Sequence, residues 1–338
     1  MHNVEDLSIA VVIPAYKVRS HVMGVISDIG SEVDLIYVVD DCCPEGSGHY
    51  VQSQCRDSRV RVIFNEQNLG VGGAVMAGYR QAVTDGASII IKIDGDGQMD
   101  PKIAMSFALP IANGDADYTK GNRFFDLQNI QRMPRIRIFG NAVLSLLTKL
   151  STGYWNIFDP TNGYTAVHAS IVKLLPLEKI SKRYFFETDM LFRLGTFRAV
   201  VRDIPMDAKY EDEVSNLKIS KVLGEFLVKH VVIFLKRIFY SYYLRDMSLA
   251  SLELPIGLGM FIIGGGFGIS RWIRSVETGI PASAGTAVIA SMLLIVGLQL
   301  ILGFLSYDIE NSPSQALHPI LGNSKTAKRY FSQKTDLG

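Results

Sequence analysis

Two aspartates, Asp94 and Asp96, stand two residues apart where an apolar run ends in the segment IIIKIDGDGQMDP. In a locally extended turn both carboxylates can approach one divalent cation, because Gly95 and Gly97 allow a sharp backbone path. A bound Mg²⁺ or Mn²⁺ keeps coordination sites for phosphate oxygens and would neutralise a diphosphate leaving group. An ordinary turn with solvated carboxylates is the alternative. The spacing indicates a candidate cation site.

Four apolar runs are expected to be strands: LSIAVVIPAY, DLIYVVDD, RVRVIFN and ASIIIKIDGD. Most of them are nearly continuous rather than alternating, which is typical of a parallel sheet covered by helices on both faces. The sequence therefore predicts an α/β fold with a doubly wound, mostly parallel sheet. Ligands of such sheets bind beyond the carboxyl ends of the strands. The candidates at those ends are Pro14, Tyr16, Asp40, Asp41, Asn65, Asn68, Asp94 and Asp96.

Length and composition narrow the function classes. The 338 residues fit two domains, and 34 basic against 33 acidic side chains give a net charge of +1, which argues against nucleic-acid binding. Three cysteines without paired spacing favour neither a disulfide framework nor a zinc site. The polar start MHNVEDLS does not resemble a cleaved signal peptide. A hydrophobic content of 48% indicates apolar surface concentrated somewhere, and so membrane contact.

That apolar surface is expected near the C-terminus. Residues 254–270 and 278–307 carry no charge and are long enough to predict two membrane helices, with a buried core hairpin as the alternative to the first. Cationic residues precede the first span and follow the second, whereas the expected connecting loop holds only Arg271 and Arg274. The imbalance predicts that both chain ends are cytoplasmic, at an inner (plasma) membrane. The cations in the flanks are Lys229, Lys236, Arg237, Arg245, Lys325, Lys328, Arg329 and Lys334.

An amphipathic stretch precedes the first span. At helical spacing Lys221, Glu225, Lys229 and Lys236 share one face, and aliphatic or aromatic side chains cover much of the other. This pattern favours a helix at the bilayer surface over a solvated face of a helical bundle. The predicted division of the chain is a cytoplasmic catalytic domain (1–215), amphipathic interfacial helices (216–248), a transmembrane hairpin (249–308) and a cytoplasmic tail (309–338).

Several motifs occur in the order typical of glycosyltransferase family 2: PAY, VVDD, NLGVGGA, DGDGQMDP, KGNRF, DPTNGY and FFETD. With its two C-terminal spans the chain resembles the polyprenyl-phosphate glycosyltransferases akin to dolichyl-phosphate mannose synthase. The resemblance covers about the first 210 residues as motifs and the remainder as architecture. It implies a GT-A fold, a nucleotide-sugar donor and an inverting transfer.

The resemblance also implies roles for single residues. Pro14, Tyr16 and Asp41 would contact the nucleoside, with Asp40 supporting their loop. Asp94 and Asp96, with Gln98 as a further ligand, would hold the cation on the diphosphate. Many relatives have Asn and Glu after the tyrosine, whereas Lys17 and Val18 stand here, so the identity of the nucleotide stays open.

The glycines of NLGVGGA do not form a dinucleotide-binding motif. Gly70, Gly72 and Gly73 lack the spacing G-x-G-x-x-G, and no acidic residue ends a following strand in the required context. Close packing of Gly73 and Ala77 on the sheet, with Asn68 capping the helix or touching the donor, explains the segment as well.

Later motifs supply candidates for the acceptor side. A guanidinium suits a phosphate because its planar fork donates two hydrogen bonds, and the resemblance places an acceptor-binding arginine near Arg123, Arg135 and Arg137; Arg123 and Arg137 are preferred over Arg135. Asp159 matches a carboxylate that relatives present to the attacking group. Because a phosphate monoester is largely ionised at neutral pH, Asp159 is expected to orient more than to deprotonate.

The acidic motif FFETD and the segment after it supply the last candidate site residues. Glu187 and Asp189 resemble a motif near the acceptor and the sugar, and a helix N-terminal turn is their alternative. Ser215 and Lys218 are weaker phosphate-binding candidates, because their spacing departs from that of relatives.

Together these features predict a membrane-anchored, metal-dependent enzyme that moves a sugar from a nucleotide-diphosphate sugar to a polyprenyl phosphate. Two alternatives stay open: a membrane-bound glycosyltransferase that extends a glycan, and a non-catalytic adaptor that binds nucleotide sugar. The sequence leaves open the sugar, the base, the choice of Mg²⁺ or Mn²⁺, and whether the chain forms a homo-oligomer.

Overall fold

The computed structural model of the chain describes residues 7–125, 135–207 and 219–323, without the side chains of residues 135–137 and 219–223. The chain divides into two compact units. One consists of residues 1–233 and 313–338, and the other of residues 234–312. Each unit has hydrophobic clusters of its own.

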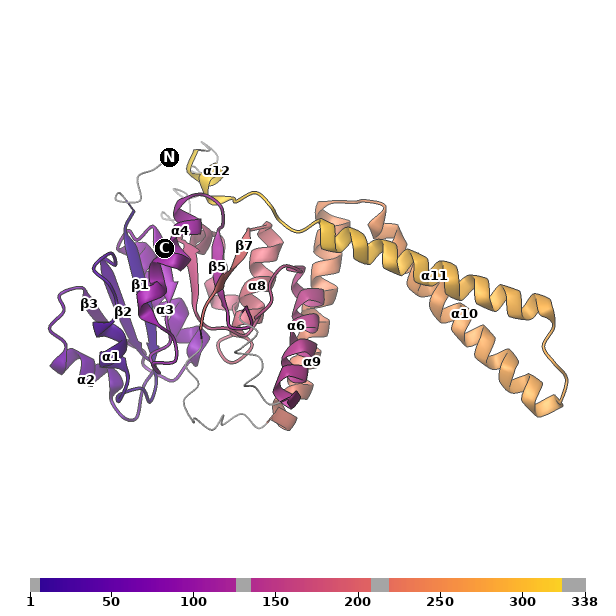
Figure 1. Cartoon of the computed structure of the whole chain (residues 1–338), viewed down its shortest axis with the longest axis horizontal. Coiled ribbons are helices and arrows are strands. Elements are labelled where there is room, and N and C mark those ends of the chain that lie inside the picture. Colours follow the sequence, from indigo (N-terminus) through magenta and orange to yellow (C-terminus); the bar gives the residue numbers. More distant parts are fainter. Residues whose placement is uncertain (1–6, 126–134, 208–218, 324–338) are drawn as a thin grey trace. The chain divides into compact units, whose positions relative to one another are not determined.

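A seven-stranded sheet forms the centre of the larger unit (Figure 1). Strand β6 runs antiparallel to its neighbours β4 and β5, and every other pair is parallel. This is the mostly parallel α/β sheet that the sequence predicts, and the four expected strands are β1 to β4. The spatial order is β3-β2-β1-β4-β6-β5-β7, with β1 (Ile9–Ala15), β2 (Leu35–Asp40), β3 (Val60–Phe64), β4 (Ile89–Lys92), β5 (Tyr118–Asn122), β6 (Thr165–His168) and β7 (Val201–Pro205).

Helices cover both faces of this sheet, and successive residues of each strand point to opposite faces. One hydrophobic cluster joins the sheet to α1 (Val22–Ser27) and α4 (Ala104–Ala112). A second joins it to α3 (Val71–Thr84), α7 (Ala169–Leu174) and α8 (Phe186–Phe197). This unit also contains α2 (Ser47–Gln54), α6 (Arg135–Thr152) and the 3₁₀ turns η2 (Pro101–Ile103) and η3 (Leu177–Lys179).

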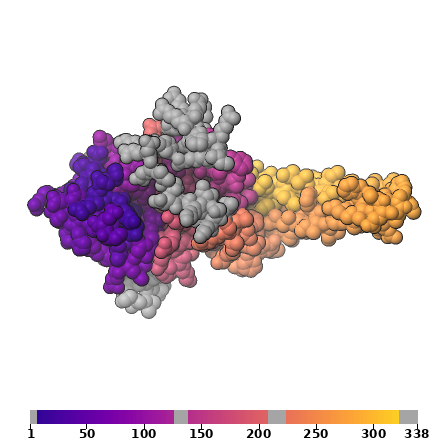
Figure 2. All heavy atoms as spheres, turned by 90° about the horizontal axis from the view of Figure 1, so that it is seen from below, coloured from indigo at the N-terminus to yellow at the C-terminus, as the bar shows by residue number. Residues whose placement is uncertain are grey.

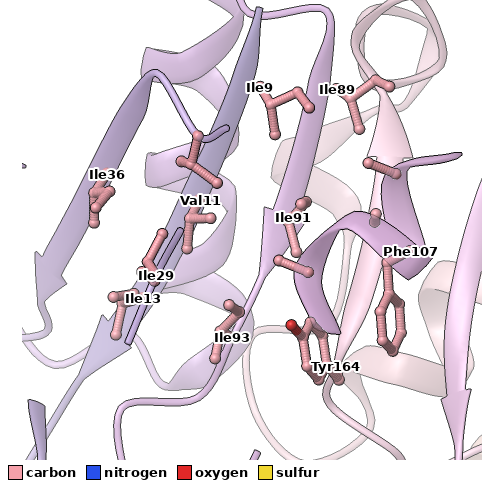
Figure 3. Close-up of a cluster of buried hydrophobic side chains, with 14 of the residues drawn as sticks. Ile9, Val11, Ile13, Ile29, Ile36, Ile89, Ile91, Ile93, Phe107 and Tyr164 are labelled. Carbon is pink, nitrogen blue, oxygen red and sulfur yellow. The ribbon is translucent and has the colours of Figure 1, made fainter. Parts of the chain in front are cut away.

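Figure 3 shows the first cluster, in which alternate residues of β1 and β4 point to the same side of the sheet. The side chains are Ile9, Val11, Ile13, Ile89 and Ile91. Phe107 of α4 stacks on Tyr164 with ring centroids 4.0 Å apart. Full burial of each such side chain stabilises the fold by about 1.5–3 kcal/mol. This packing holds the central strands, and therefore their carboxyl ends, in place.

The segment that follows the second apolar helix returns to the larger unit. Asp117, which is fully buried, accepts hydrogen bonds from the backbone N–H groups of Val200, Leu317 and His318 at 2.8–2.9 Å. The His318 ring stacks on His168, and α12 (His318–Asn323) packs against α7. Burial alone would raise the pKa of Asp117, but its hydrogen bonds with the His318 ring and with these backbone N–H groups hold that pKa below its usual value. Asp117 therefore anchors residues 317–318 to the sheet.

The smaller unit contains a helical hairpin. Helix α9 (Ile219–Phe239) enters it and ends in a π-helical turn (Tyr240–Arg245), which precedes α10 (Ala250–Thr278) and α11 (Ala284–Glu310). Helices α10 and α11 lie side by side in both views (Figure 1, Figure 2). Gly257, Gly264 and Gly297 permit this, because a Cβ at each would lie 2.7–2.9 Å from atoms of the facing helix. Small residues that let backbones approach are typical of membrane helix pairs.

Both hairpin helices are long and apolar enough to cross a membrane. Only 11% and 17% of their most apolar windows are buried within the structure, which does not fit a buried core hairpin. The prediction placed Arg271 and Arg274 in the connecting loop, and this was wrong. Helix α10 continues through both arginines to Thr278 and ends where Gly279 adopts the left-handed conformation that favours glycine.

A buried ion pair links α9 to the C-terminal end of α11. Arg237 of α9 donates two hydrogen bonds to Asp308 of α11, at 2.6 and 3.0 Å, and Tyr242 donates a third. Arg237 and Asp308 are 7% and 5% exposed, so each compensates the desolvated charge of the other.

Replacing Asp117 by alanine is expected to destabilise the larger unit by about 2–4 kcal/mol, because it leaves buried N–H donors without an acceptor. Urea denaturation of the full chain in detergent measures this. Asp115→Ala, at an exposed position two residues earlier, is the control and should change stability by less than about 0.5 kcal/mol. Equal effects of the two substitutions would contradict the anchoring role of Asp117.

Candidate active site

A cavity of about 360 Å³ opens at the carboxyl edge of the parallel strands. Residues from the ends of β1, β2 and β4, the start of α3 and the segment before α8 line it. Among them are six of the predicted site residues: Pro14, Tyr16, Asp41, Asn68, Asp94 and Asp96. The structure brings these six together at the edge where the topology of the sheet predicts a ligand.

Asp94 and Asp96 present their carboxylates from the loop after β4. The side chain of Asp94 is 27% exposed and pairs with the buried ammonium of Lys92 at 2.8 Å. Asp96 accepts the backbone N–H of Gln98 at 3.0 Å, which closes a tight turn, and Gly97 in that turn has a φ of +80°. Only a short turn separates the two residues, and both line the cavity.

Two further aspartates shape the loops around the cavity. Asp40 accepts the backbone N–H groups of Cys43 and Gly48 at 2.7 and 2.6 Å, so it holds the loop after β2. Asp41 accepts from the backbone of Leu69 and Gly70 at 2.9 and 2.6 Å, and therefore fixes the entry to α3. Of the two, only Asp41 lines the cavity.

The segment before α8 crosses the N-terminal end of α3 at close range. The backbone carbonyl of Lys182 accepts from Gly72 at 2.9 Å, and a Cβ at Gly70 or Gly72 would lie 2.5–2.6 Å from backbone oxygens of this segment. Gly70 and Gly72 are thus needed for contact with residues 181–183. A Cβ at Gly73 would meet Leu69 rather than the sheet, so the expected packing of Gly73 on the sheet was wrong; Gly78 is the α3 glycine packed on Val12 and Val39. Asn68 does not cap α3: it donates to the backbone carbonyl of Asp41 at 3.2 Å.

This crossing adds residues that the motifs do not single out. Arg183 and Tyr184 line the first cavity and also a second one of about 620 Å³, which reaches Glu225, Phe226 and Lys229 of α9. Lys229 pairs with Glu225 at 2.6 Å. Only the tertiary approach of residues 181–184 to α3 makes Arg183 a site residue.

Arg123 and Asp159 form a bidentate ion pair. The Arg123 guanidinium donates to the two carboxylate oxygens at 2.7 and 3.0 Å, and Asp159 is fully buried. Burial alone would raise the pKa of Asp159, but the Arg123 hydrogen bonds and charge hold it below its usual value. A carboxylate in this state is a poor proton acceptor, so its geometry favours orienting Arg123 over deprotonation.

Charged residues also lie buried beneath the cavity. Lys92 of β4 is 3.7 Å from Glu187 of α8, and burial raises the pKa of Glu187. The Asp94 and Glu187 charges outweigh the desolvation of Lys92 and raise its pKa, so it stays protonated. Lys120 of β5 donates to the backbone carbonyl of Asn162, and burial lowers its pKa to about 8. Burial likewise raises the pKa of Asp203 on β7 to about 6.

The other predicted residues take varied positions. Asp189 accepts the backbone N–H of Ser181 at 2.7 Å and pairs with Arg193, so it supports the segment before α8. Gln98, Glu187, Asp159 and Arg123 do not line the 360 Å³ cavity. The side chain of Arg137, and Ser215 and Lys218 entirely, lie outside the described residues.

The oxygen donors at the cavity suit a hard divalent cation. In the described ranges no group of three His, Cys, Asp or Glu side chains forms a closed metal site. Two carboxylates that share an open cavity fit Mg²⁺ or Mn²⁺, which keep positions for phosphate oxygens and water. Phosphate oxygens of a bound substrate would complete the coordination of a cation at such a site.

Comparison with known proteins agrees with this arrangement. Residues 10–175 match the family described as Glycosyl transferase family 2. A UDP-N-acetylglucosamine–dolichyl-phosphate N-acetylglucosaminyltransferase of Methanococcus voltae is 27% identical, over 68% of this chain and 97% of its own. An undecaprenyl-phosphate mannosyltransferase of Micrococcus luteus is 28% identical, over 66% of this chain and 92% of its own.

A solved structure shows the same fold. Glucosyl-3-phosphoglycerate synthase from Mycobacterium tuberculosis, in complex with Mn²⁺, uridine diphosphate and phosphoglyceric acid, superposes with a TM-score of 0.50 at 18% identity. The match covers 69% of this chain and 79% of that one. The likeness concerns the fold, and it confirms the predicted GT-A architecture.

Replacing Arg123 by methionine leaves the buried Asp159 charge without its ion-pair partner, which should cost about 3–5 kcal/mol of stability at pH 7. Without Arg123, burial raises the folded-state pKa of Asp159, so the loss should shrink as the pH falls from 7 to 5 and the carboxyl takes up a proton. In the wild type the folded pKa is lowered, so the contribution of Asp159 persists above its unfolded pKa and is lost only at more acid pH.

Thermal denaturation in detergent at the two pH values measures this difference. The double variant Arg123→Met/Asp159→Asn removes both charges and should recover part of the stability at pH 7. A loss that is the same at pH 7 and pH 5 would contradict the ion-pair account.

Proposed function

Because residues 10–175 are a glycosyltransferase family 2 domain, we propose that the protein transfers a sugar from a nucleotide-diphosphate sugar to a polyprenyl phosphate, with inversion at the anomeric carbon. The relatives from Methanococcus voltae and Micrococcus luteus are named for transfer to such lipid phosphates. The observation that carries the proposal is the shared cavity of Asp94, Asp96 and Asp41 at the carboxyl edge of the sheet.

The donor would occupy the 360 Å³ cavity. In this assignment Pro14, Tyr16 and Asp41 contact the nucleoside, Asn68 lies beside it, and Asp40 supports the loop. Asp94 and Asp96, with Gln98 as a further ligand, hold a divalent cation, which supplies charge neutralisation for the departing diphosphate. Mn²⁺ in the M. tuberculosis synthase complex supports a divalent cation here, and Mg²⁺ is the other candidate.

The acceptor phosphate would be bound from the side of Arg123 and Arg137. Its oxygen forms the new bond to the anomeric carbon as the bond from that carbon to the diphosphate oxygen breaks, and the nucleoside diphosphate leaves. Asp159 orients Arg123 in this scheme and takes no proton, because the attacking phosphate is already ionised. Glu187 and Asp189 lie on the sugar side, where Asp189 holds the segment that carries Arg183.

The hairpin would place the chain in a membrane. Both flanks of the hairpin, residues up to 233 and from 313 onward, belong to the same unit, and Asp117 anchors the second flank. A two-helix hairpin with this connection returns to the side from which it entered. Together with the cationic flanks this supports a multi-pass inner (plasma) membrane protein with a cytoplasmic catalytic domain and cytoplasmic termini.

In this proposal the functional division is a catalytic domain (1–215), interfacial helices (216–248), a hairpin (249–308) and a tail (309–338). The exposed apolar side chains of α9, among them Leu227, Val228, Val231 and Leu235, support its position at a bilayer surface. A polyprenyl phosphate, which does not diffuse through water, could be bound by the protein at that surface.

Transfer can be tested with the full chain in detergent, radiolabelled nucleotide sugars and a short polyprenyl phosphate. Label should reach the organic phase with Mg²⁺ or Mn²⁺ and disappear with a chelator. Asp96→Ala should reduce the rate by about 10²-fold or more, as expected when a group that stabilises developing charge is lost. Asp100→Ala, four residues on and outside the cavity lining, should keep most of the rate.

Each alternative has its own outcome. Unchanged transfer by Asp96→Ala would refute the cation assignment. Labelled products longer than one sugar would indicate a glycan-extending enzyme, and no label with any donor would favour a nucleotide-sugar-binding adaptor.

A further inference from the structure

A buried lysine occupies one side of the proposed cation site. The Lys92 side chain is 1% exposed, and its ammonium lies 2.8 Å from the Oδ1 atom of Asp94. Its other acidic neighbour, Glu187, is 3.7 Å away. Lys92 is thus an internal cation in contact with a carboxylate that lines the cavity.

The fold keeps space for this contact. A Cβ at Gly163 would overlap the Asp94 carboxylate and lie 2.6 Å from the Lys92 ammonium, so a side chain at this position would displace the pair. Thr165 of β6 pairs with Lys92 on one side and with Lys120 on the other, which puts the two lysines in one row across the sheet. Only Lys92 forms an ion pair with Asp94 among the described residues.

We propose that Lys92 is a positioning residue that acts as the internal counter-ion of Asp94, so that the divalent cation binds well only together with the donor's diphosphate. The inference rests on the proposed function. A positive charge beside Asp94 repels a divalent cation on the same carboxylate, and the negative charges of a diphosphate offset that repulsion. Lys92 therefore ties cation binding to donor binding.

Removal of Lys92 is expected to change the affinity for the cation in the direction opposite to that expected for an ordinary structural ion pair. Removal of a purely structural partner would loosen Asp94 and weaken cation binding. Removal of a competing positive charge would strengthen it, because the charges of Asp94 and Asp96 at the cavity would be less compensated. A disordered variant cannot produce tighter binding, so the sign separates the two roles.

The test is a Mn²⁺ titration of the full chain in detergent without nucleotide, followed by the electron paramagnetic resonance signal of free Mn²⁺. Lys92→Met should lower the Kd for Mn²⁺ by about tenfold or more, because it removes a unit charge in contact with Asp94. Lys92→Arg keeps the charge and should stay within about threefold of the wild type. Lys120→Met is the matched control, a lysine of the same row without contact to Asp94, and should also stay within about threefold.

Unchanged or weaker Mn²⁺ binding by folded Lys92→Met would overturn the proposal. The wild type provides a measurement free of folding effects: a nucleoside diphosphate should lower its Kd for Mn²⁺ by about tenfold or more, and Mn²⁺ should do the same for the nucleotide. Independent binding of the two in the wild type would overturn the proposal if Lys92→Met does not fold. If the Asp96→Asn variant bound Mn²⁺ as tightly as the wild type, that result would instead refute the cation site, and thus the proposed function.

Discussion

Parallel strands bring their carboxyl ends to one edge of the sheet, and the negative charge collected there has to be compensated. Asp40, Asp41, Asp94 and Asp96 lie at or just after the ends of strands that end at this edge. Backbone N–H groups satisfy Asp40 and Asp41, which turns two of the charges into supports for loops. Asp94 and Asp96 remain as the carboxylates around an open cavity, and Lys92 offsets part of their charge. The proposed cation completes this balance when the donor binds.

The same constraint explains the buried charges elsewhere beneath the site. Asp159 is fully buried and is stable there because Arg123 donates to both of its oxygens. Glu187 lies near Lys92, and Lys120 donates to the carbonyl of Asn162 in the loop that contains Asp159. The donor side and the acceptor side of the proposed site are therefore built on one set of compensated charges. A change of one partner is expected to affect chiefly the groups in direct contact with it.

Much of this arrangement can be predicted from the sequence, and the exceptions have a common cause. Long apolar runs identify β1 to β4, and several residues at or just beyond the ends of these strands line the cavity. Strand β5 (YTKGN) carries no apolar pattern, because its Lys120 and Asn122 are buried by partners distant in sequence. The Arg123–Asp159 pair spans 36 residues, and Arg183 reaches the cavity only through the contact of its segment with α3. Pairings of this kind depend on tertiary structure, and sequence spacing does not encode them.

The central claim is that Asp94 and Asp96 hold a divalent cation in the cavity where the donor binds. Replacement of that cation by Fe²⁺, followed by oxidative cleavage of the backbone and mapping of the fragments by mass spectrometry, tests it most directly. The account predicts cleavage close to residues 94–98, stronger in the presence of a nucleoside diphosphate and absent in Asp94→Asn/Asp96→Asn. Cleavage that maps to other segments, or that persists unchanged in the double variant, would contradict it.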